Sequence, residues 1–358
     1  MQEGTAGRRP RAGAALVVGT AVSAAVGAAV VAAPHWWGLG GTRPFAWAVS
    51  FRLPLGLGLA GLAGLAGLLG LSGPRGGSRR QLAAPVAAVL GVAAAGSLGV
   101  TLARGLSAGS LPPAGPADVT VVAANVRFAS ADRDAVAGLV VRHGADAVSL
   151  PEADLAYARD VAARVAAAGG PRMQVLFRTD RGDGRDRFGT ALLVTDRWGP
   201  YRDTGELDDG FKAVVTAAPV AGEGPVLAAA HTAAPVSALL EAWRAEVAAV
   251  ADWCGATPDA LVAGDLNATL DHPGLAGADG CVDAGRATGT GARGTWPQRV
   301  PAALGAGIDH VLGHAASWEP AGTVVADLPG SDHRAVVARW RPVAAPGTAS
   351  PGDHEGTR

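Results

Sequence analysis

The sequence predicts an α/β protein in which two packed β-sheets flanked by helices are preceded by three transmembrane helices. Three observations lead to this prediction. The first hundred residues are apolar and nearly free of acids, short apolar runs then alternate with longer amphipathic segments, and polar side chains recur where the apolar runs stop. Short apolar runs are typical of strands, and apolar residues three or four positions apart are typical of helices.

Residues 1–104 have the composition of a membrane anchor. Residues 1–105 contain nine arginines and a single acid, Glu3, among residues that are otherwise mostly apolar or small. A helix needs roughly 20 apolar residues to cross a bilayer. Three stretches fit: about Ala14–Ala33, about Leu53–Ser72 with an alternative start near Ala46, and about Leu82–Ala103. A cleaved signal peptide is the alternative for the first stretch, but the two further stretches favour a permanent anchor.

The arginines predict how the anchor is oriented. They lie before the first stretch, at Arg8, Arg9 and Arg11, and between the second and third, at Arg75, Arg79 and Arg80. Both segments are therefore expected in the cytoplasm. Three crossings then put everything after Arg104 outside the cytoplasm, with Trp47 at the outer interface. Small residues at every third or fourth position of the second stretch fit either close approach of another helix or a glycine-rich face toward lipid.

The rest of the chain has the character of an acidic soluble domain. Residues 106–358 carry the remaining 21 basic and 30 acidic side chains, a formal charge of −9. Residues 105–117 are rich in Gly, Pro and Ser and predict a linker, and residues 342–358 predict a disordered tail. Cys254 and Cys281 are the only cysteines. A disulfide and two independent buried thiols both remain open.

Strands and helices alternate across residues 118–341. The sequence predicts strands at 118–127, 145–154, 173–178, 189–196, 212–220, 224–232, 261–267, 308–313 and 333–340, and helices at 131–144, 155–168 and 238–254. The first and last parts alternate strand and helix, whereas the middle strands are spaced like an antiparallel meander. This order favours two sheets packed face to face with helices outside, and one mixed doubly wound sheet is the alternative.

Polar side chains recur at the ends of these predicted strands. They are Asn125, Glu152, His231, Asp265, Asn267, Asp309, and the pair Asp332 and His333. Layered β folds place active sites at strand ends, because the sheet holds the side chains rigidly while the loops leave them open. Residues i and i+2 of a strand face the same way, so Asp265 and Asn267 project together. Each residue alone could have a structural role, but their recurrence favours an active site.

The segments AANVR, LPEAD, AAHTAAP, GDLNATLDHP, GIDHV and GSDHRAV together resemble the endonuclease/exonuclease/phosphatase superfamily, the DNase I-like fold, over about residues 118–341. The resemblance implies a four-layer α/β sandwich and cleavage of phosphate esters that depends on Mg²⁺ or Mn²⁺. It implies that Glu152 is the main metal carboxylate, with Asn125 beside it and Asp332 at the edge of the metal site. Such a site suits the chemistry, because Mg²⁺ takes oxygen ligands and usually only one or two protein carboxylates.

The same resemblance implies the roles of the remaining strand-end residues. Asp265 would position or deprotonate the attacking water, and Asn267 would hold a phosphate oxygen. His231 and His333 would donate to phosphoryl oxygens, with Asp309 orienting the ring of His333. Some nucleases of the superfamily carry an acid where this chain has Arg127, which leaves a second metal carboxylate open. His310 and His314 are expected to have no catalytic role.

Three functions follow from these observations. The first is a membrane-anchored, divalent-metal-dependent phosphohydrolase outside the cytoplasm, whose neighbour is the lipid bilayer and whose substrates are lipid phosphates, phosphodiesters or polyprenyl pyrophosphates. The second is an extracellular metal-dependent nuclease, which the charge of −9 disfavours because neutralised phosphates dominate nucleic-acid binding. The arginine-rich loop at 178–187 could still touch one phosphate group. The third is an inactive binding module, disfavoured because every expected catalytic position is filled.

Overall fold

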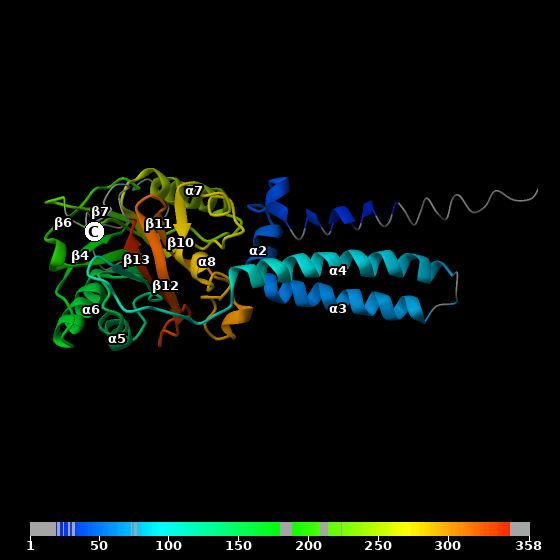
Figure 1. Ribbon diagram of the computed structural model, residues 1–358, viewed down its shortest axis with the longest axis horizontal. Coiled ribbons are helices and arrows are strands. Elements are labelled where there is room, and N and C mark those ends of the chain that lie inside the picture. The colour runs from blue at the N-terminus through cyan, green and yellow to red at the C-terminus, as the bar shows by residue number, and fades with distance from the viewer. Residues whose placement is uncertain are drawn as a thin grey trace, which may run out of the picture.

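A sandwich of two β-sheets flanked by helices forms one end of the molecule, and a hairpin of two long helices extends from it (Figure 1). The computed structural model describes residues 33–72, 74, 77–179, 188–207, 214–222 and 224–343, and also 19, 22–23, 25–27 and 29–30. The α/β class predicted from the sequence, with two sheets rather than one doubly wound sheet, is confirmed.

The N-terminal part of the chain, which is predicted to be a membrane anchor and is called the anchor below, contains one short and two long described helices. A 3-10 turn, η1 (Pro34–Trp37), precedes α2 (Phe45–Ser50), and the hairpin consists of α3 (Arg52–Leu71) and α4 (Ser78–Arg104). Within the described residues, two helices are long and apolar enough to cross a membrane. The first stretch predicted to span, Ala14–Ala33, falls largely outside them, so only two of the three predicted spans are seen. The second begins at Arg52 rather than near Ala46, because α2 is a separate helix.

Two glycines of α3 explain how closely the hairpin packs. A Cβ added at Gly56 would lie 2.9 Å from the side chain of Leu98 on α4, and one at Gly70 would lie 2.9 Å from the Cβ of Ala83. The glycines between them, such as Gly61 and Gly64, face open space. Close approach of another helix is therefore seen at the two ends of α3, whereas the glycines in its middle do not contact α4. A glycine-rich face toward lipid stays a prediction.

The first sheet has seven strands in the order β1-β12-β13-β2-β3-β5-β4. Their bounds are β1 Gly109–Ser110, β2 Val119–Ala123, β3 Ala147–Ala153, β4 Met173–Arg178, β5 Gly189–Thr195, β12 Trp318–Ala326 and β13 Ala335–Pro342. Successive residues of a strand face opposite sides. Val122 and Val148 pack against α5 (Arg133–His143) and α6 (Leu155–Ala167), whereas Val121 and Ala147 face the other sheet.

The second sheet has six strands in the order β10-β11-β9-β8-β7-β6. Their bounds are β6 Tyr201–Asp203, β7 Val215–Pro219, β8 Val226–His231, β9 Ala260–Asp265, β10 Cys281–Asp283 and β11 Asp309–His314. Leu261 faces the first sheet, and Val262 packs against α7 (Leu240–Ala256). The helices thus lie outside and the shared apolar core lies between the sheets, as the sequence predicts.

The sequence analysis missed several edge elements. They are β1, β6, β10, β12, the helix α8 (Ala284–Thr288), and the 3-10 turns η2 (Asp196–Trp198) and η3 (Ala302–Leu304). The predicted meander is also divided, since β4 and β5 pair in the first sheet and β6, β7 and β8 pair in the second. The predicted linker at 105–117 contains β1, which pairs with β12. All of these elements except β12 have five residues or fewer, which gives them weak apolar patterns. β12 has nine residues and lies between β1 and β13, but only four of its residues are buried.

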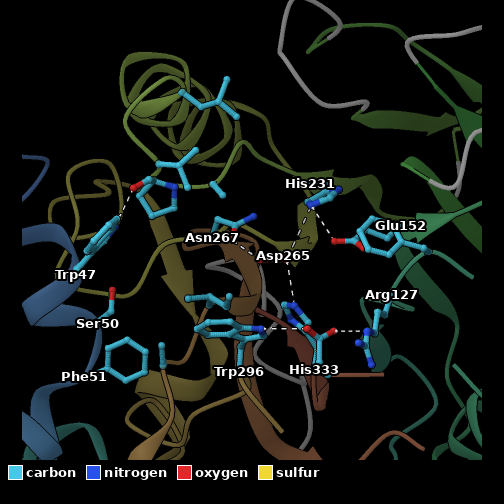
Figure 2. Close-up of a pocket in the computed structure, with 18 residues that line it drawn as sticks. Trp47, Ser50, Phe51, Arg127, Glu152, His231, Asp265, Asn267, Trp296 and His333 are labelled. Carbon is cyan, nitrogen blue, oxygen red and sulfur yellow. Dashed lines mark hydrogen bonds and ion pairs between the residues drawn. The ribbon is translucent and has the colours of Figure 1, made fainter. Parts of the chain in front are cut away.

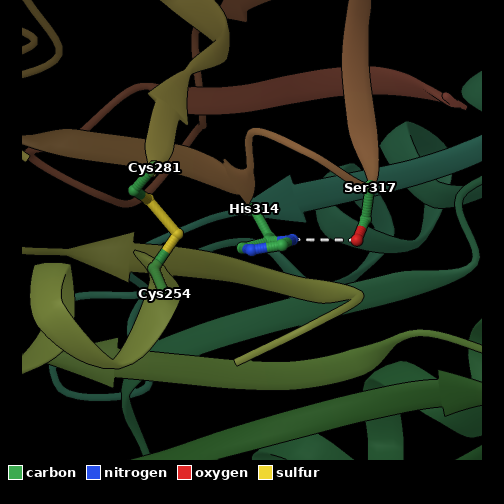
Figure 3. Close-up of a disulfide and its surroundings, with 4 residues drawn as sticks. All are labelled: Cys254, Cys281, His314 and Ser317. Carbon is green, nitrogen blue, oxygen red and sulfur yellow. Dashed lines mark hydrogen bonds between the residues drawn. A yellow bond between two sulfur atoms is a disulfide. The ribbon is translucent and has the colours of Figure 1, made fainter. Parts of the chain in front are cut away.

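A disulfide joins the two cysteines that the sequence left open. Cys254 in the last turn of α7 is bonded to Cys281 of β10, with their Cα atoms 5.7 Å apart (Figure 3). It closes a segment of 27 residues between a covering helix and an edge strand. Cross-linking such a segment restricts the unfolded chain, so the disulfide stabilises this edge of the second sheet.

A buried ion-pair cluster fixes the anchor to the sandwich. Asp271 lies after β9 and accepts hydrogen bonds from Arg52, the first residue of α3, at 2.5 and 2.6 Å. Its carboxylate also accepts bonds from Arg104, the last residue of α4, at 2.5 and 2.8 Å. Burial disfavours the charged form of the Asp271 carboxyl group and on its own would raise the pKa. The hydrogen bonds and charges of the two guanidinium groups outweigh burial, so the pKa of Asp271 is lowered. The long helices are therefore docked rigidly and are not merely tethered by a linker.

The neighbouring residue adds a second connection between anchor and sandwich. The Nδ1 atom of His272 accepts the backbone N–H of Thr269 at 2.7 Å, so Nε2 carries the proton and donates to the carbonyl of Ala46 at 2.8 Å. Burial lowers the pKa of His272 to about 4, which keeps the ring neutral in this arrangement. Asp271 and His272, part of the motif quoted for the family resemblance, thus hold α2 and the hairpin in place.

We predict that Asp271→Ala destabilises the full-length protein by about 3 kcal/mol, because the buried guanidinium of Arg52 and the part-buried guanidinium of Arg104 lose their counter-charge. The measurement is urea unfolding in detergent, followed by tryptophan fluorescence. Asp134→Ala is the control, because it removes an ion pair to Arg164 in which Asp134 is 76% exposed, and it should change the midpoint very little. Equal stability of the two variants would show that the cluster does not hold the anchor.

Candidate active site

The topology brings the predicted polar residues to one edge of the sandwich. Almost all neighbouring strands are antiparallel, but β2 pairs with β3 and β8 pairs with β9 in parallel, one pair at the centre of each sheet. The carboxyl ends of these four strands carry Asn125, Glu152, His231 and Asp265. An antiparallel strand starts where its neighbour ends, so Asp309 at the start of β11 lies opposite Asp265.

Asp265 lies at the centre of this group. Its Oδ2 accepts a hydrogen bond from Asn125 Nδ2 at 2.9 Å, and its Oδ1 accepts the backbone N–H of Asn267 at 2.9 Å. The Nε2 atoms of His231 and His333 lie 3.9 and 3.8 Å from Oδ2. The residue is 1% exposed. One buried carboxylate thus connects side chains from both sheets.

The environment of Asp265 makes its carboxylate unusually basic. Burial raises its pKa, the nearby Asp309 raises it further, and His333 and the hydrogen bonds from Asn267 and Asn125 only partly offset this, which leaves a pKa of about 7. A carboxylate with a pKa near neutrality can accept and release a proton under physiological conditions. This property fits the predicted role of Asp265 in deprotonating water.

His333 and Asp309 form a buried hydrogen-bonded pair. The ring Nδ1 of His333 lies 2.9 Å from Asp309 Oδ2, which orients Nε2 toward Asp265. Burial disfavours a charged ring, but Asp309, Asp265 and the hydrogen bond to Asp309 outweigh it and raise the pKa of His333 to about 10. The ring is therefore a cation at neutral pH, with two N–H donors. The sequence analysis expected Asp309 to orient this ring, and the two side chains are placed accordingly.

Glu152 reaches the site through an irregularity in β3. The register between β3 and β5 shifts between Pro151 and Ala153, so Glu152 is an extra residue in a β-bulge, and its φ of 58° is in the left-handed region. Bulges next to active sites redirect a side chain, and a strained non-glycine residue there points to function. Glu152 Oε1 accepts from Asn125 Nδ2 at 3.1 Å and lies 3.8 Å from His231 Nε2.

Asn267 is also held in the left-handed region, with a φ of 46°. Its Nδ2 donates to the carbonyl of Thr232 at 3.0 Å, and the backbone carbonyl of Asn267 accepts a hydrogen bond from Trp243 Nε1 at 3.1 Å. An amide group has two N–H bonds, so one remains for a phosphate oxygen when the first is used in this way. Asn267 lines the pocket described below, as its predicted role requires.

Asp332 lies farther out than the other predicted residues. Its side chain is 41% exposed, lies 3.7 Å from Arg127 Nε, and accepts from Trp296 Nε1 at 3.3 Å. Among the described residues, it belongs to neither of the two groups that could hold a metal. Its assignment to the metal edge stays a prediction, and the geometry places it at the rim.

The two histidines that are expected to have no catalytic role form hydrogen bonds away from the site. His310 lies 2.8 Å from Asp283 Oδ2 through Nδ1 and 2.8 Å from the carbonyl of Ala268 through Nε2. His314 lies 2.8 Å from Ser317 Oγ, near the disulfide (Figure 3). Neither lines the catalytic pocket.

The site opens into a pocket of about 620 Å³ with two different sides (Figure 2). Glu152, His231, Asp265 and His333 lie on one side, and Trp47 and Phe51 of the anchor lie on the other. Sequence reasoning missed the anchor side, because residues more than 180 positions apart meet there, as in the bond from Trp47 Nε1 to the carbonyl of Pro235 at 2.9 Å. Trp47, which the sequence predicts at the outer membrane interface, also contacts the sandwich. A tryptophan directly before a membrane span was the available signal.

The donor set fits a divalent cation. Glu152, His231 and Asp265 each offer a ligand atom within 4.8 Å of one another, and so do Asp265, Asp309 and His333. Metal ligands must be deprotonated. Because the pKa of His333 is raised to about 10, the first group is the better candidate. Carboxylate oxygens, with the amide of Asn125 bonded to both acids, suit a hard cation such as Mg²⁺ or Mn²⁺.

Two packed sheets with acids and histidines gathered at one edge are the arrangement that the resemblance to phosphate-ester hydrolases implies. The model of the Endonuclease/Exonuclease/phosphatase family matches residues 122–333, more than half of the sequence, and the chain belongs to this family. Members of the family are generally phosphate-ester hydrolases and typically depend on divalent metals. The matched residues include all eight predicted site residues.

Several solved structures are similar to this chain. An endonuclease/exonuclease/phosphatase from Beutenbergia cavernae shares 20% identity, covers 65% of this chain and 73% of its own, and has a TM-score of 0.48. A mannosyl-6-phosphatase of Bacteroides thetaiotaomicron shares 16% identity over 63% of this chain and 100% of its own, with a TM-score of 0.47. The human Nocturnin catalytic domain with bound sulfate shares 14% identity over 66% of this chain and 97% of its own, with a TM-score of 0.47. No curated protein shows significant sequence similarity to the chain.

We predict that Asp309→Asn lowers the pKa of His333 in the metal-free protein, because it removes the strongest favourable charge beside the ring. Histidine NMR titration measures the shift, and His143 is the internal control because burial, Arg142 and Arg339, and not Asp309, lower its pKa. In the wild type, protonation of His333 stabilises the fold fully below its unfolded pKa of 6.5, and this stabilisation is lost as the pH rises through about 10. An unchanged titration of His333 would contradict the pairing.

Proposed function

We propose that the protein is a divalent-metal-dependent phosphoesterase, anchored in a membrane by α3 and α4, which acts outside the cytoplasm on lipid-linked phosphates. The observation that carries this proposal is the pocket in which Glu152, Asp265, His231 and His333 meet beside residues of the anchor. The first four supply charge and proton transfer for phosphate chemistry. The anchor residues supply apolar surface that a soluble phosphate does not need.

The roles of the side chains follow from their protonation and position. Glu152, with Asn125 beside it, would hold the cation, which supplies charge to stabilise the phosphoryl group and to activate water. Asp265, with its pKa of about 7, accepts the proton of the attacking water. The ring of His333 is a cation. Its Nδ1–H donates to Asp309, and its Nε2–H donates to a phosphoryl oxygen.

His231 and Asn267 complete the polar side of the pocket. His231 Nε2 lies 3.8 Å from Glu152 Oε1 and 3.9 Å from Asp265 Oδ2, so the ring either joins the cation or donates to the phosphate. Asn267 offers an amide proton to a phosphate oxygen. Arg127, which lines the pocket and is 54% exposed, adds a positive charge at the rim that the sequence analysis had treated only as a missing acid.

The location rests on two further observations. The arginine distribution in the sequence favours an extracytoplasmic catalytic domain, and the disulfide between Cys254 and Cys281 is a bond that persists in oxidising compartments. The acidic charge of the catalytic part speaks against a nuclease, which must bind a long polyanion. The nuclease is therefore the alternative outcome of the activity test below.

We predict that the full-length protein hydrolyses a phosphate ester with Mg²⁺ or Mn²⁺, and that chelation by EDTA stops the reaction. His333→Ala should lower kcat by about 100-fold or more, the usual contribution of an acid-base group. Glu152→Ala should lower activity and weaken Mn²⁺ binding measured by calorimetry. Glu319→Ala is the control, since this exposed acid on β12 lies outside the pocket.

The substrates for this test are phosphatidic acid, bis(para-nitrophenyl) phosphate, pyrophosphate, DNA and RNA. Turnover of nucleic acid alone would favour the nuclease. No turnover of any of them with either metal would favour an inactive binding module.

We also predict that the catalytic domain is outside the cytoplasm. Alkaline phosphatase fused after Arg358, which is active only after export, should be active in cells. Green fluorescent protein exported through the general secretory pathway does not become fluorescent, so its fusion at the same position should be dark. The opposite pair of results would overturn the proposed location without affecting the proposed chemistry.

A further inference from the structure

We propose that Trp47 and Phe51 of the anchor are specificity-determining residues that hold the hydrocarbon part of the substrate beside the catalytic groups. The proposed substrate is therefore an amphiphile in which a phosphate is joined to a long hydrocarbon chain, taken from the same bilayer that holds the anchor. This inference rests on the proposed phosphoesterase function and adds the part of the substrate that the catalytic residues do not select.

The pocket is one continuous space with chemically distinct sides. Its polar side carries the proposed catalytic acids and histidines, whereas Trp47 and Phe51 lie on the opposite side (Figure 2). Pro235, bonded to Trp47, and the nearby Val236 and Leu239 also line the pocket. Trp47 and Val236 are each 45% exposed. Large apolar side chains left half open beside a polar reaction centre are typical of a subsite for an apolar ligand group.

The position of the anchor side is fixed by specific bonds. Trp47 Nε1 donates to the carbonyl of Pro235 at 2.9 Å, and the guanidinium of Arg43 lies 4.1 Å from the centre of the Trp47 ring. His272 donates to the carbonyl of Ala46, next to Trp47 in α2. The tryptophan is thus held in place before a substrate arrives, which lowers the cost of ordering on binding.

The buried ion pairs tie the same wall to the catalytic strand. Phe51 directly precedes Arg52, and Arg52 is bonded to Asp271 in the segment that follows Asp265 and Asn267. Phe51 also packs against Trp296 on the opposite part of the pocket, with ring centres 6.4 Å apart. The apolar wall and the proton-accepting carboxylate therefore belong to one rigid unit.

The occupant follows from where the wall leads. Phe51 is followed immediately by α3, and Leu57, Leu62 and Leu65 of that helix are more than half exposed. Exposed leucines on a helix long enough to cross a bilayer are expected to face lipid. A hydrocarbon chain with its phosphate at the catalytic groups would lie against Trp47 and Phe51 and continue into the bilayer beside α3.

Charge excludes the other common occupants of such a pocket. A nucleic acid would extend its charged backbone across the apolar side, where the residues that line the pocket offer no cation to phosphates that lose water. A small soluble phosphate would leave the open faces of Trp47 and Phe51 uncovered. An amphiphile satisfies both sides at once, since its head meets the polar groups and Arg127, and its chain meets the aromatic rings.

The test compares full-length wild type, Trp47→Ala and Phe51→Ala in nanodiscs of neutral lipid, with methyl, octyl and tetradecyl phosphate as substrates. The wild type should prefer the tetradecyl ester, as measured by kcat/KM. In each variant, the ratio of kcat/KM for tetradecyl phosphate to kcat/KM for methyl phosphate should fall about tenfold. Truncating one apolar contact commonly changes discrimination between substrates by at least that factor. Trp37→Ala is the matched control, as this anchor tryptophan is 53% exposed and lies outside the pocket.

A second measurement is independent of turnover. Calorimetric binding of tetradecylphosphonate, which is not hydrolysed, should weaken about tenfold in Trp47→Ala and be retained in Trp37→Ala. Partition into the nanodisc is the same for all variants, so differences report the pocket. Trp47→Phe and Phe51→Leu keep an apolar surface and should restore most of the binding, which a merely structural defect would not predict.

The outcomes separate this inference from the proposed function. If the wild type hydrolyses phosphates but Trp47→Ala and Phe51→Ala keep its chain-length preference, the inference is wrong and the phosphoesterase stands. An equal loss for methyl and tetradecyl phosphate also overturns it, since that result indicates damage to the catalytic side. If the wild type hydrolyses none of these monoesters, the phosphonate measurement decides: equal binding by wild type and Trp47→Ala overturns the inference. The proposed function is then judged separately, on the substrates of the activity test.

Discussion

The buried carboxylate of Asp265 is the group on which the rest of the site depends. It lies between the two sheets, accepts hydrogen bonds from Asn125 and the backbone of Asn267, and has an imidazole on either side, at 3.9 and 3.8 Å. An isolated buried charge is costly, so it must be protonated, paired with a cation or surrounded by donors. The raised pKa of Asp265 and the charged ring of His333 both follow from this one requirement, and so does the proposal that the site holds a metal.

The predicted anchor is bonded to the sandwich and also forms part of the pocket wall. Two arginines at the ends of α3 and α4 converge on Asp271, six residues after Asp265, and α2 is bonded to His272. The buried carboxylate neutralises one buried and one part-buried cation, and removing any of the three leaves charge without its partner. The hairpin, the segment after β9 and the pocket wall therefore keep fixed relative positions, which a flexible linker could not ensure.

Much of the fold and most of the site could be predicted from the sequence, for physical reasons. Central strands such as β2, β3 and β9 are buried on both faces, so their apolar runs are clear, and the polar residues that end them mark the active edge. Edge strands such as β6 and β10 lack this pattern, and the sequence could not show that the chain changes sheet after β5. The anchor side of the pocket depends on contacts between Trp47 and Pro235, which are far apart in the chain and carry no periodic signal. Nor could the sequence show the bulge that directs Glu152 into the site, because it arises from the pairing of β3 with β5.

The central claim is that the acids and histidines at the strand ends form a metal site that faces the anchor. The most direct test is X-ray diffraction from crystals of the full-length protein grown with Mn²⁺, with data recorded at the manganese absorption edge. We predict an anomalous peak in the pocket beside Glu152, the carboxylate assigned to the cation and a member of the group that it forms with His231 and Asp265. A pocket without a peak at saturating Mn²⁺, or a peak only at surface acids elsewhere, would contradict it.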